Sequence, residues 1–253
     1  MSGSHPPIDL LEGIQSGLDR LTEAMKRDND KIQQVCRGNH YTIYEGSYED
    51  ARGRFPAKFE NDGRMLRLKV LDVVFESADF DLLSVVSARG PLDGFSFYQD
   101  DLCSCALHVG LEVVVRSGDE DTVSLLEVEV ALPPWDEGIN YERFRLTLRH
   151  HMGVFQSSGK EDTFETALQQ LSRQFPSGTR IRSCLFCQYG DYNPGGNPSF
   201  GGMMCFRNIK EEYNRVRGKG DFWGIARRCD RYVQETFLCS EFEDRIPGSG
   251  YRG

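Results

Sequence analysis

The chain of 253 residues is acidic, with 39 Asp and Glu against 30 Lys and Arg and a formal charge of −9. Hydrophobic residues make up 39% and charged residues 27%, which is typical of a soluble globular protein. No apolar run approaches the roughly 18 residues that a membrane-spanning helix needs. The N-terminus has no basic segment followed by an apolar core, so we expect no secretory signal and a cytoplasmic location.

The charge is unevenly distributed along the sequence. Residues 173–253 hold 13 Lys and Arg against 9 Asp and Glu, a local charge of +4, so the remainder carries −13. A dedicated nucleic-acid binder usually shows a strong basic face, so nucleic acid is not the expected partner. The acidic part of the chain favours a basic or neutral protein partner instead.

The first segment, residues 8–36, is predicted to be an amphipathic helix. Its apolar residues repeat with alternating spacings of three and four, as in a short coiled coil: Leu11, Ile14, Leu18, Leu21 and Met25. This helix either packs on its own domain or mediates self-association or docking on another protein. Leu18 and Leu21 are the candidate contact residues for such a partner.

From residue 38 to residue 160 the apolar period changes from helical to two, which predicts β-strands. The clearest alternations lie in residues 107–115, 126–132 and 144–148. Glu127 and Glu129 lie on the polar face of one strand, and Arg145 and Arg149 lie on the polar face of another. Such opposed rows favour neighbouring antiparallel strands. Near Val70 the apolar phase flips, which we interpret as a β-bulge.

A second helix is predicted from about Asp162 to Phe175, ended by the Pro-Ser-Gly at 176–178. We therefore expect an α+β fold with an antiparallel, β-sandwich-like core, although a strongly curved sheet would give the same pattern. Three regions follow: an N-terminal amphipathic helix (1–37), the antiparallel β core (38–160), and a helix with a four-cysteine lobe (161–253).

Cysteine spacing in the last region predicts a zinc site. Cys184 and Cys187 form a C-x-x-C at the end of a strand, which lets one tight turn direct two sulfurs at a tetrahedral cation. Cys205 follows a loop rich in Gly, Pro and Asn. We choose Cys239 as the fourth ligand and keep Cys229 in reserve.

Four thiolates would complete the coordination shell of zinc and leave no position for a reactive water, so the predicted site is structural. A catalytic zinc usually has three protein ligands and an open position. Redox use of the C-x-x-C would require a helix directly after it, as in thioredoxin-like proteins. The sequence QYGDYNPGG follows instead.

The blocks CLFCQYGDYNPGG, GGMMCFRNIKEEY and VQETFLCSEFEDR in the last third of the chain carry a family resemblance. Together they resemble an uncharacterised family of bacterial proteins without an assigned activity. In that pattern the last block supplies the fourth thiolate, which maps onto Cys239. The resemblance implies no catalytic residue.

The loop from Tyr189 to Gly202 is the candidate recognition surface. Tyr189, Asp191, Tyr192 and Asn193 combine aromatic and polar groups, which suits partner binding. Ordinary turn formation explains the same residues equally well, since NPGG favours turns.

These patterns favour a non-enzymatic, protein-binding role, as an adaptor, an inhibitor or an immunity-like protein with a structural zinc. Nucleophile-elbow and phosphate-loop motifs are absent from the sequence. The alternatives are an enzyme whose active site is assembled from dispersed residues, and nucleic-acid binding through the C-terminal lobe.

Overall fold

The computed structural model describes residues 41–134, 142–196 and 200–252. These ranges are mostly antiparallel β-structure with short helices, so the predicted β-rich α+β class is confirmed. The predicted N-terminal helix, with Leu18 and Leu21, lies outside the described residues. Within the described ranges, no helix has the length and apolarity that a membrane crossing requires.

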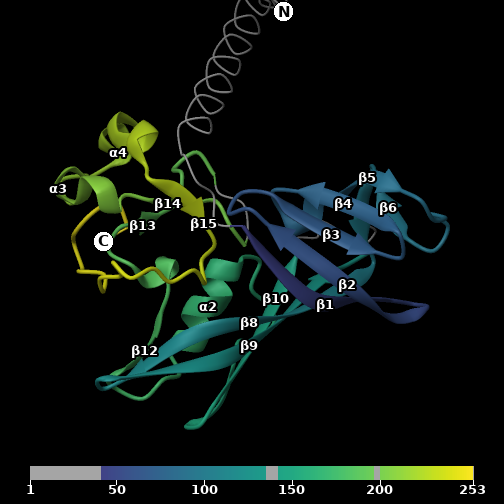
Figure 1. Ribbon diagram of the computed structural model, residues 1–253, viewed down its shortest axis with the longest axis horizontal. Coiled ribbons are helices and arrows are strands. Elements are labelled where there is room, and N and C mark those ends of the chain that lie inside the picture. Colours follow the sequence, from purple (N-terminus) through teal and green to yellow (C-terminus); the bar gives the residue numbers. More distant parts are fainter. Residues whose placement is uncertain (1–40, 135–141, 197–199, 253) are drawn as a thin grey trace, which may run out of the picture.

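Twelve strands form one antiparallel sheet (Figure 1). In chain order they are β1 (Thr42–Asp50), β2 (Gly53–Asn61), β3 (Leu66–Val70), β4 (Val73–Ser77), β5 (Ser84–Ala88), β6 (Ser96–Tyr98), β7 (Asp101–Cys103), β8 (Cys105–Ser117), β9 (Glu120–Leu132), β10 (Arg143–His150), β11 (Gly153–Gln156) and β12 (Thr179–Arg182). Across the sheet the order is β11-β10-β9-β8-β1-β2-β3-β4-β5-β7-β6, and β12 pairs with β8. The strands are thus continuously hydrogen-bonded instead of forming two separate sheets.

The remaining elements are short and lie mainly in the C-terminal part. The helices are α2 (Phe164–Ser172), α3 (Lys210–Tyr213) and α4 (Lys219–Ile225). A second, three-stranded sheet is formed by β13 (Gly190–Asp191), β14 (Met203–Cys205) and β15 (Arg231–Val233). Single 3-10 turns occupy Phe80–Leu82, Cys184–Phe186, Arg207–Ile209 and Ala226–Arg228.

The predicted pairing of the Glu and Arg rows is confirmed. β9 and β10 are antiparallel neighbours, with Arg145 opposite Glu129. The Arg149 guanidinium donates two hydrogen bonds to the Glu127 carboxylate, at 3.0 and 3.1 Å. The side-chain pattern alone therefore identified both the partner strand and the polar face.

The prediction of a β-bulge near Val70 is wrong, because β3 and β4 pair regularly up to Val70 and Val73. β3 and β4 are instead joined by a two-residue turn in which Leu71 and Asp72 both have positive φ, 49° and 62°. A two-residue hairpin turn of this kind matches the right-handed twist of its strands. It reverses the chain, and this reversal produces the phase flip that the sequence shows.

The main core lies between α2 and the inner face of the sheet. Thr163 accepts a hydrogen bond from the Thr166 amide at 3.1 Å and so caps α2. The Phe164 ring packs edge-on against Phe144 of β10, with 5.9 Å between ring centroids. Phe200, from the loop that precedes β14, joins the same cluster. The C-terminal region therefore contributes directly to the core of the sheet.

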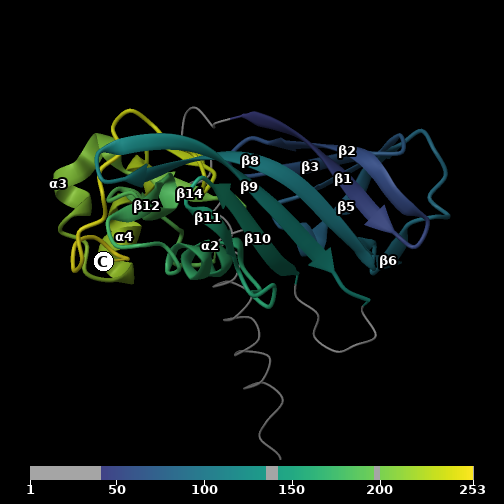
Figure 2. The same ribbon diagram turned by 90° about the horizontal axis from the view of Figure 1, so that it is seen from below.

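On the side of β8 that faces away from β9, two different strands pair with it, and a gap remains between them. Residues 106–109 pair with β1, and residues 114–117 pair with β12. The first half of β1 diverges from β8 toward the C-terminal lobe (Figures 1 and 2). The segment Gln234–Leu238 runs beside this gap, where the Tyr44 hydroxyl donates a hydrogen bond to the Gln234 side chain.

Candidate functional sites

The first two cysteines lie on one tight turn that follows β12. The Cys187 amide donates to the Cys184 carbonyl at 3.2 Å, and the Gly190 amide donates to the Cys187 carbonyl at 3.3 Å. A side chain at Gly190 would place its Cβ 2.3 Å from the Cys184 carbonyl oxygen. Glycine is therefore required for the chain to turn back this closely.

Backbone pairing brings the other two cysteines to this turn. Cys205 of β14 lies opposite Gly190 of β13. The Cys184 amide donates to the carbonyl of Phe237 at 2.7 Å, two residues before Cys239. Three stretches that are distant in the sequence thus meet at one corner of the C-terminal lobe.

Electrostatics shows that all four thiols are neighbours. Burial raises the pKa of Cys184 well above its usual range, and the nearby Cys187, Cys205 and Cys239 raise it further. Burial also raises the pKa of Cys205 to about 11. All four are free thiols, whereas Cys229 is disulfide-bonded. Among the residues that the structure describes, no group of three or more His, Cys, Asp and Glu is arranged as a formed metal site.

The residues of the predicted recognition loop are mostly buried and hydrogen-bonded internally. The Asp191 carboxylate accepts from the Tyr213 hydroxyl at 2.7 Å and from the Tyr192 amide at 2.8 Å. The Tyr189 hydroxyl donates to Glu243 at 3.0 Å. Their recognition role stays a prediction, and these contacts give them a structural role in the lobe.

Asn193 is the more exposed member of the predicted set. Its side-chain oxygen accepts the amide hydrogen of Gly195 at 2.8 Å, and its carbonyl accepts that of Gly196 at 3.1 Å. This is the local turn chemistry that asparagine favours.

Replacing Asp191 with alanine should destabilise the protein by about 1–3 kcal/mol, because it leaves the buried Tyr213 hydroxyl without its acceptor. Urea unfolding of the variant measures this loss. Asn193→Ala is the matched control, because its side chain is partly exposed and its expected loss is smaller. Equal stability of Asp191→Ala and the natural protein would show that the network contributes nothing.

A buried carboxyl group, Glu235, was not singled out by the sequence. It is 1% exposed, and its Oε1 accepts a hydrogen bond from the Tyr192 hydroxyl at 2.8 Å. Its Oε2 has no partner. Burial raises the pKa of Glu235 to about 7, and the nearby Glu165 adds to this increase. Glu235 follows β15 directly, and no local pattern marks a glutamate there as buried.

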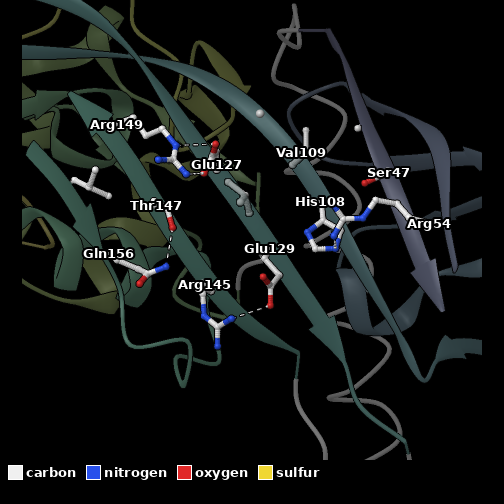
Figure 3. A pocket seen from close by; sticks show the side chains of 14 residues that line it. Ser47, Arg54, His108, Val109, Glu127, Glu129, Arg145, Thr147, Arg149 and Gln156 are labelled. Carbon is white, nitrogen blue, oxygen red and sulfur yellow. Dashed lines mark hydrogen bonds and ion pairs between the residues drawn. The ribbon is translucent and has the colours of Figure 1, made fainter. Parts of the chain in front are cut away.

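The outer face of the sheet, turned away from α2, carries a polar groove of about 660 Å³ (Figure 3). It crosses β11, β10, β9, β8, β1 and β2, and cross-strand ion pairs line it. His108 and Arg54 both contact the Glu49 carboxylate, at 3.1 Å and 2.5 Å between nearest atoms. Arg145 pairs with Glu129 across the same groove at 3.3 Å.

Aliphatic side chains stand exposed on this outer face. Ile43 of β1 is 49% exposed, Val123 and Leu125 of β9 are 64% and 45% exposed, and Val154 of β11 is 62% exposed. On β9 these positions alternate with buried ones, as the strand period requires. The outer face therefore combines paired charges with unburied apolar area.

One comparison with known proteins gives a match. The model of a family of unknown function, DUF6304, covers residues 42–190. The chain belongs to this family. No curated protein and no solved structure matches it.

The DUF6304 match runs from the start of β1 to Gly190, so it spans the large sheet, α2 and the C-x-x-C turn. It ends before Cys205 and Cys239. Membership of a family of unknown function agrees with the uncharacterised family expected from the sequence, although the match covers mainly the sheet and includes only the start of the three blocks that carry the resemblance.

Proposed function

We propose that the protein binds another protein through the outer face of its sheet, without catalysing a reaction. The observation that carries this proposal is the group of exposed aliphatic side chains on that face: Ile43, Val123, Leu125 and Val154. Contiguous apolar area rimmed by polar groups is characteristic of protein-interaction sites. Among the described residues, six cysteines are free thiols and Cys229 is disulfide-bonded; this excess of free thiols favours a reducing compartment, so we place the function in the cytosol.

The ion pairs beside these side chains would add specificity. Arg149 lies between Leu125 of β9 and Val154 of β11, and Arg145 pairs with Glu129 farther along the same two strands, β9 and β10. Polar rims steer encounter and select partners more than they strengthen binding. A partner would therefore present apolar side chains that are flanked by its own charges.

We further propose that Cys184, Cys187, Cys205 and Cys239 bind one zinc ion that stabilises the C-terminal lobe. Support comes from the turn that holds the first pair, from the pairing of Cys205 with Gly190, and from the raised pKa values of Cys184 and Cys205, to which the neighbouring thiols contribute. Zinc would require loss of the thiol protons and closure of the four sulfurs to about 2.3 Å from the ion.

The protein-binding proposal is tested by cross-linking capture with the full chain and a Leu125→Lys, Val154→Lys variant. Lysines at these positions should abolish capture of any specific partner, because they place charges on the apolar part of the face. The matched control is Leu82→Lys, Ile246→Lys, which changes two other exposed aliphatic residues, at 50% and 60% exposure.

Proteins captured by the natural chain and by the control, but lost with the outer-face variant, support the proposal. Mass spectrometry should also place the cross-links on β8, β9 or β10. Capture that is the same with all three chains contradicts it. Thermal unfolding of each variant verifies that the fold is intact.

A further inference from the structure

The gap along β8 forms a notch in the sheet. Val109 is the last residue of β8 that pairs with β1, and Val114 is the first that pairs with β12. In the part of the chain that the structure describes, no strand pairs with Gly110–Val113 on this side. The other side of this stretch is fully paired with β9. The notch thus exposes a short strand edge inside an otherwise continuous sheet.

The notch is a cavity of about 490 Å³, within the range of ligand-binding clefts. Its walls include the aliphatic side chains of Ile43, Val114 and Val123. Its floor is the segment Gln234–Leu238, of which Gln234, Thr236, Phe237 and Leu238 line the cavity. The carbonyl of Phe237 in this floor accepts the Cys184 amide. The floor is therefore anchored to the four-cysteine corner.

Two polar side chains at the notch, those of Gln234 and Glu112, are available to contact a bound molecule. Gln234 is 1% exposed, and its Oε1 accepts the hydrogen bond from Tyr44. Its Nε2 has no partner, and an unsatisfied buried donor costs free energy until an acceptor reaches it. Glu112 lies at the rim with an exposed carboxylate.

We propose that this notch binds an extended peptide segment with aliphatic and basic side chains, which adds as a strand to β8. The inference rests on the proposed protein-binding function and identifies the kind of partner segment. The strand edge supplies backbone hydrogen bonds, and the aliphatic walls accept alternate side chains, as in other cases of strand addition. Four residues at about 3.3 Å per residue match a stretch of about 13 Å.

The negative charge at the notch favours a basic peptide over an acidic one. The Glu112 carboxylate is the charged group that lines the notch, and the chain as a whole carries −9. A lysine or arginine beside the aliphatic residues of the peptide would pair with Glu112 at the rim. An acidic peptide would meet like charge there, which disfavours its binding.

The test uses an immobilised array of seven-residue peptides in which Val, Ile or Thr alternates with Lys, and a second array with Glu in place of Lys. The full chain should bind members of the first array and bind the second at least about tenfold more weakly. Glu112→Lys should reduce binding to the first array by about tenfold. Glu120→Lys, an equivalent charge reversal on exposed β9, should leave it unchanged.

Amide hydrogen exchange locates the bound peptide. The strongest binder in solution should slow exchange at Gly110–Val113 while leaving β6, at the far edge of the sheet, unchanged. Absence of binding to the first array, equal binding to both arrays, or protection elsewhere overturns the inference. Capture of a partner through Leu125 and Val154, which do not line the notch, together with any of these results leaves the protein-binding function intact and removes the notch as its site.

Discussion

Replacing Cys184 with serine is expected to abolish zinc retention and to unfold the C-terminal lobe. Zinc held by four thiolates contributes on the order of 10 kcal/mol to the folding of small zinc domains, more than any other change considered for this protein. The lobe has a small apolar cluster of its own, which includes Met204, Phe206 and Tyr213. The proposed zinc would add to the stability of this cluster.

Elemental analysis of protein purified without chelator should give about one zinc per chain for the natural sequence and none for Cys184→Ser. Cys103→Ser is the control, because Cys103 is a free thiol outside the lobe. Cys239→Ser should lower the zinc content, whereas Cys229→Ser should not. Natural protein without metal, or Cys184→Ser with full zinc, would refute the site.

A chelator separates the metal from the side chain. Removal of zinc should lower the melting temperature of the natural protein to that of Cys184→Ser, because the two then lack the same interaction. A variant that stays less stable than the metal-free protein would instead show that the buried serine hydroxyl causes the loss.

The sequence predicts the features of this molecule that depend on local periodicity. Strand alternation placed Leu107, Leu126 and Phe144 on the inner face, and all three are fully buried. The opposed Glu and Arg rows also gave the correct neighbour for β9. These predictions succeed because successive side chains of a strand point to opposite faces of the sheet, and because opposite charges pair between neighbouring strands.

Non-local contacts could not be predicted in this way. The sequence suggests an exposed turn for Asp191 and Tyr192, yet the chain segments around Tyr213 and Glu235 cover them. The C-terminal tail is held by contacts such as the hydrogen bond that the Ile246 amide donates to the Gln188 side-chain oxygen at 2.6 Å. Whether a polar residue is buried depends on segments that are distant in the sequence, and the local sequence does not show which segments these are.

Replacing Glu235 with glutamine is expected to stabilise the protein at pH 8 by up to about 3 kcal/mol and to have no such effect near pH 4.5. The pKa of Glu235 is about 7 in the folded protein, raised first by burial, compared with 4.5 for an ordinary glutamate. Ionisation of the buried group, whose Oε2 lacks a partner, therefore opposes folding.

The sign of the pH dependence follows from these two pKa values. Below about pH 4.5 both folded and unfolded chains hold the proton, so Glu235 imposes no penalty. Between pH 4.5 and 7 the unfolded chain releases the proton first, and stability falls as pH rises. Above pH 7 the full penalty applies, about 1.4 kcal/mol for each pH unit between the two pKa values.

Glu161→Gln is the matched control, because Glu161 is also a buried glutamate but has the opposite shift. Burial alone would raise its pKa, yet hydrogen bonds from Ser158 and from neighbouring backbone amides outweigh burial and lower the pKa. Its ionised form stabilises the fold, and because its folded pKa lies below 4.5 this contribution is nearly complete at pH 4.5, so Glu161→Gln should be less stable than the natural protein across the range above about pH 4.5. Urea unfolding from pH 4.5 to pH 8 measures both variants against the natural protein. The difference in unfolding free energy should be positive and increase with pH for Glu235→Gln, and should be negative and nearly constant over this range for Glu161→Gln. A pH-independent difference for Glu235→Gln would mean that this carboxyl group keeps an ordinary pKa and is reached by water in solution.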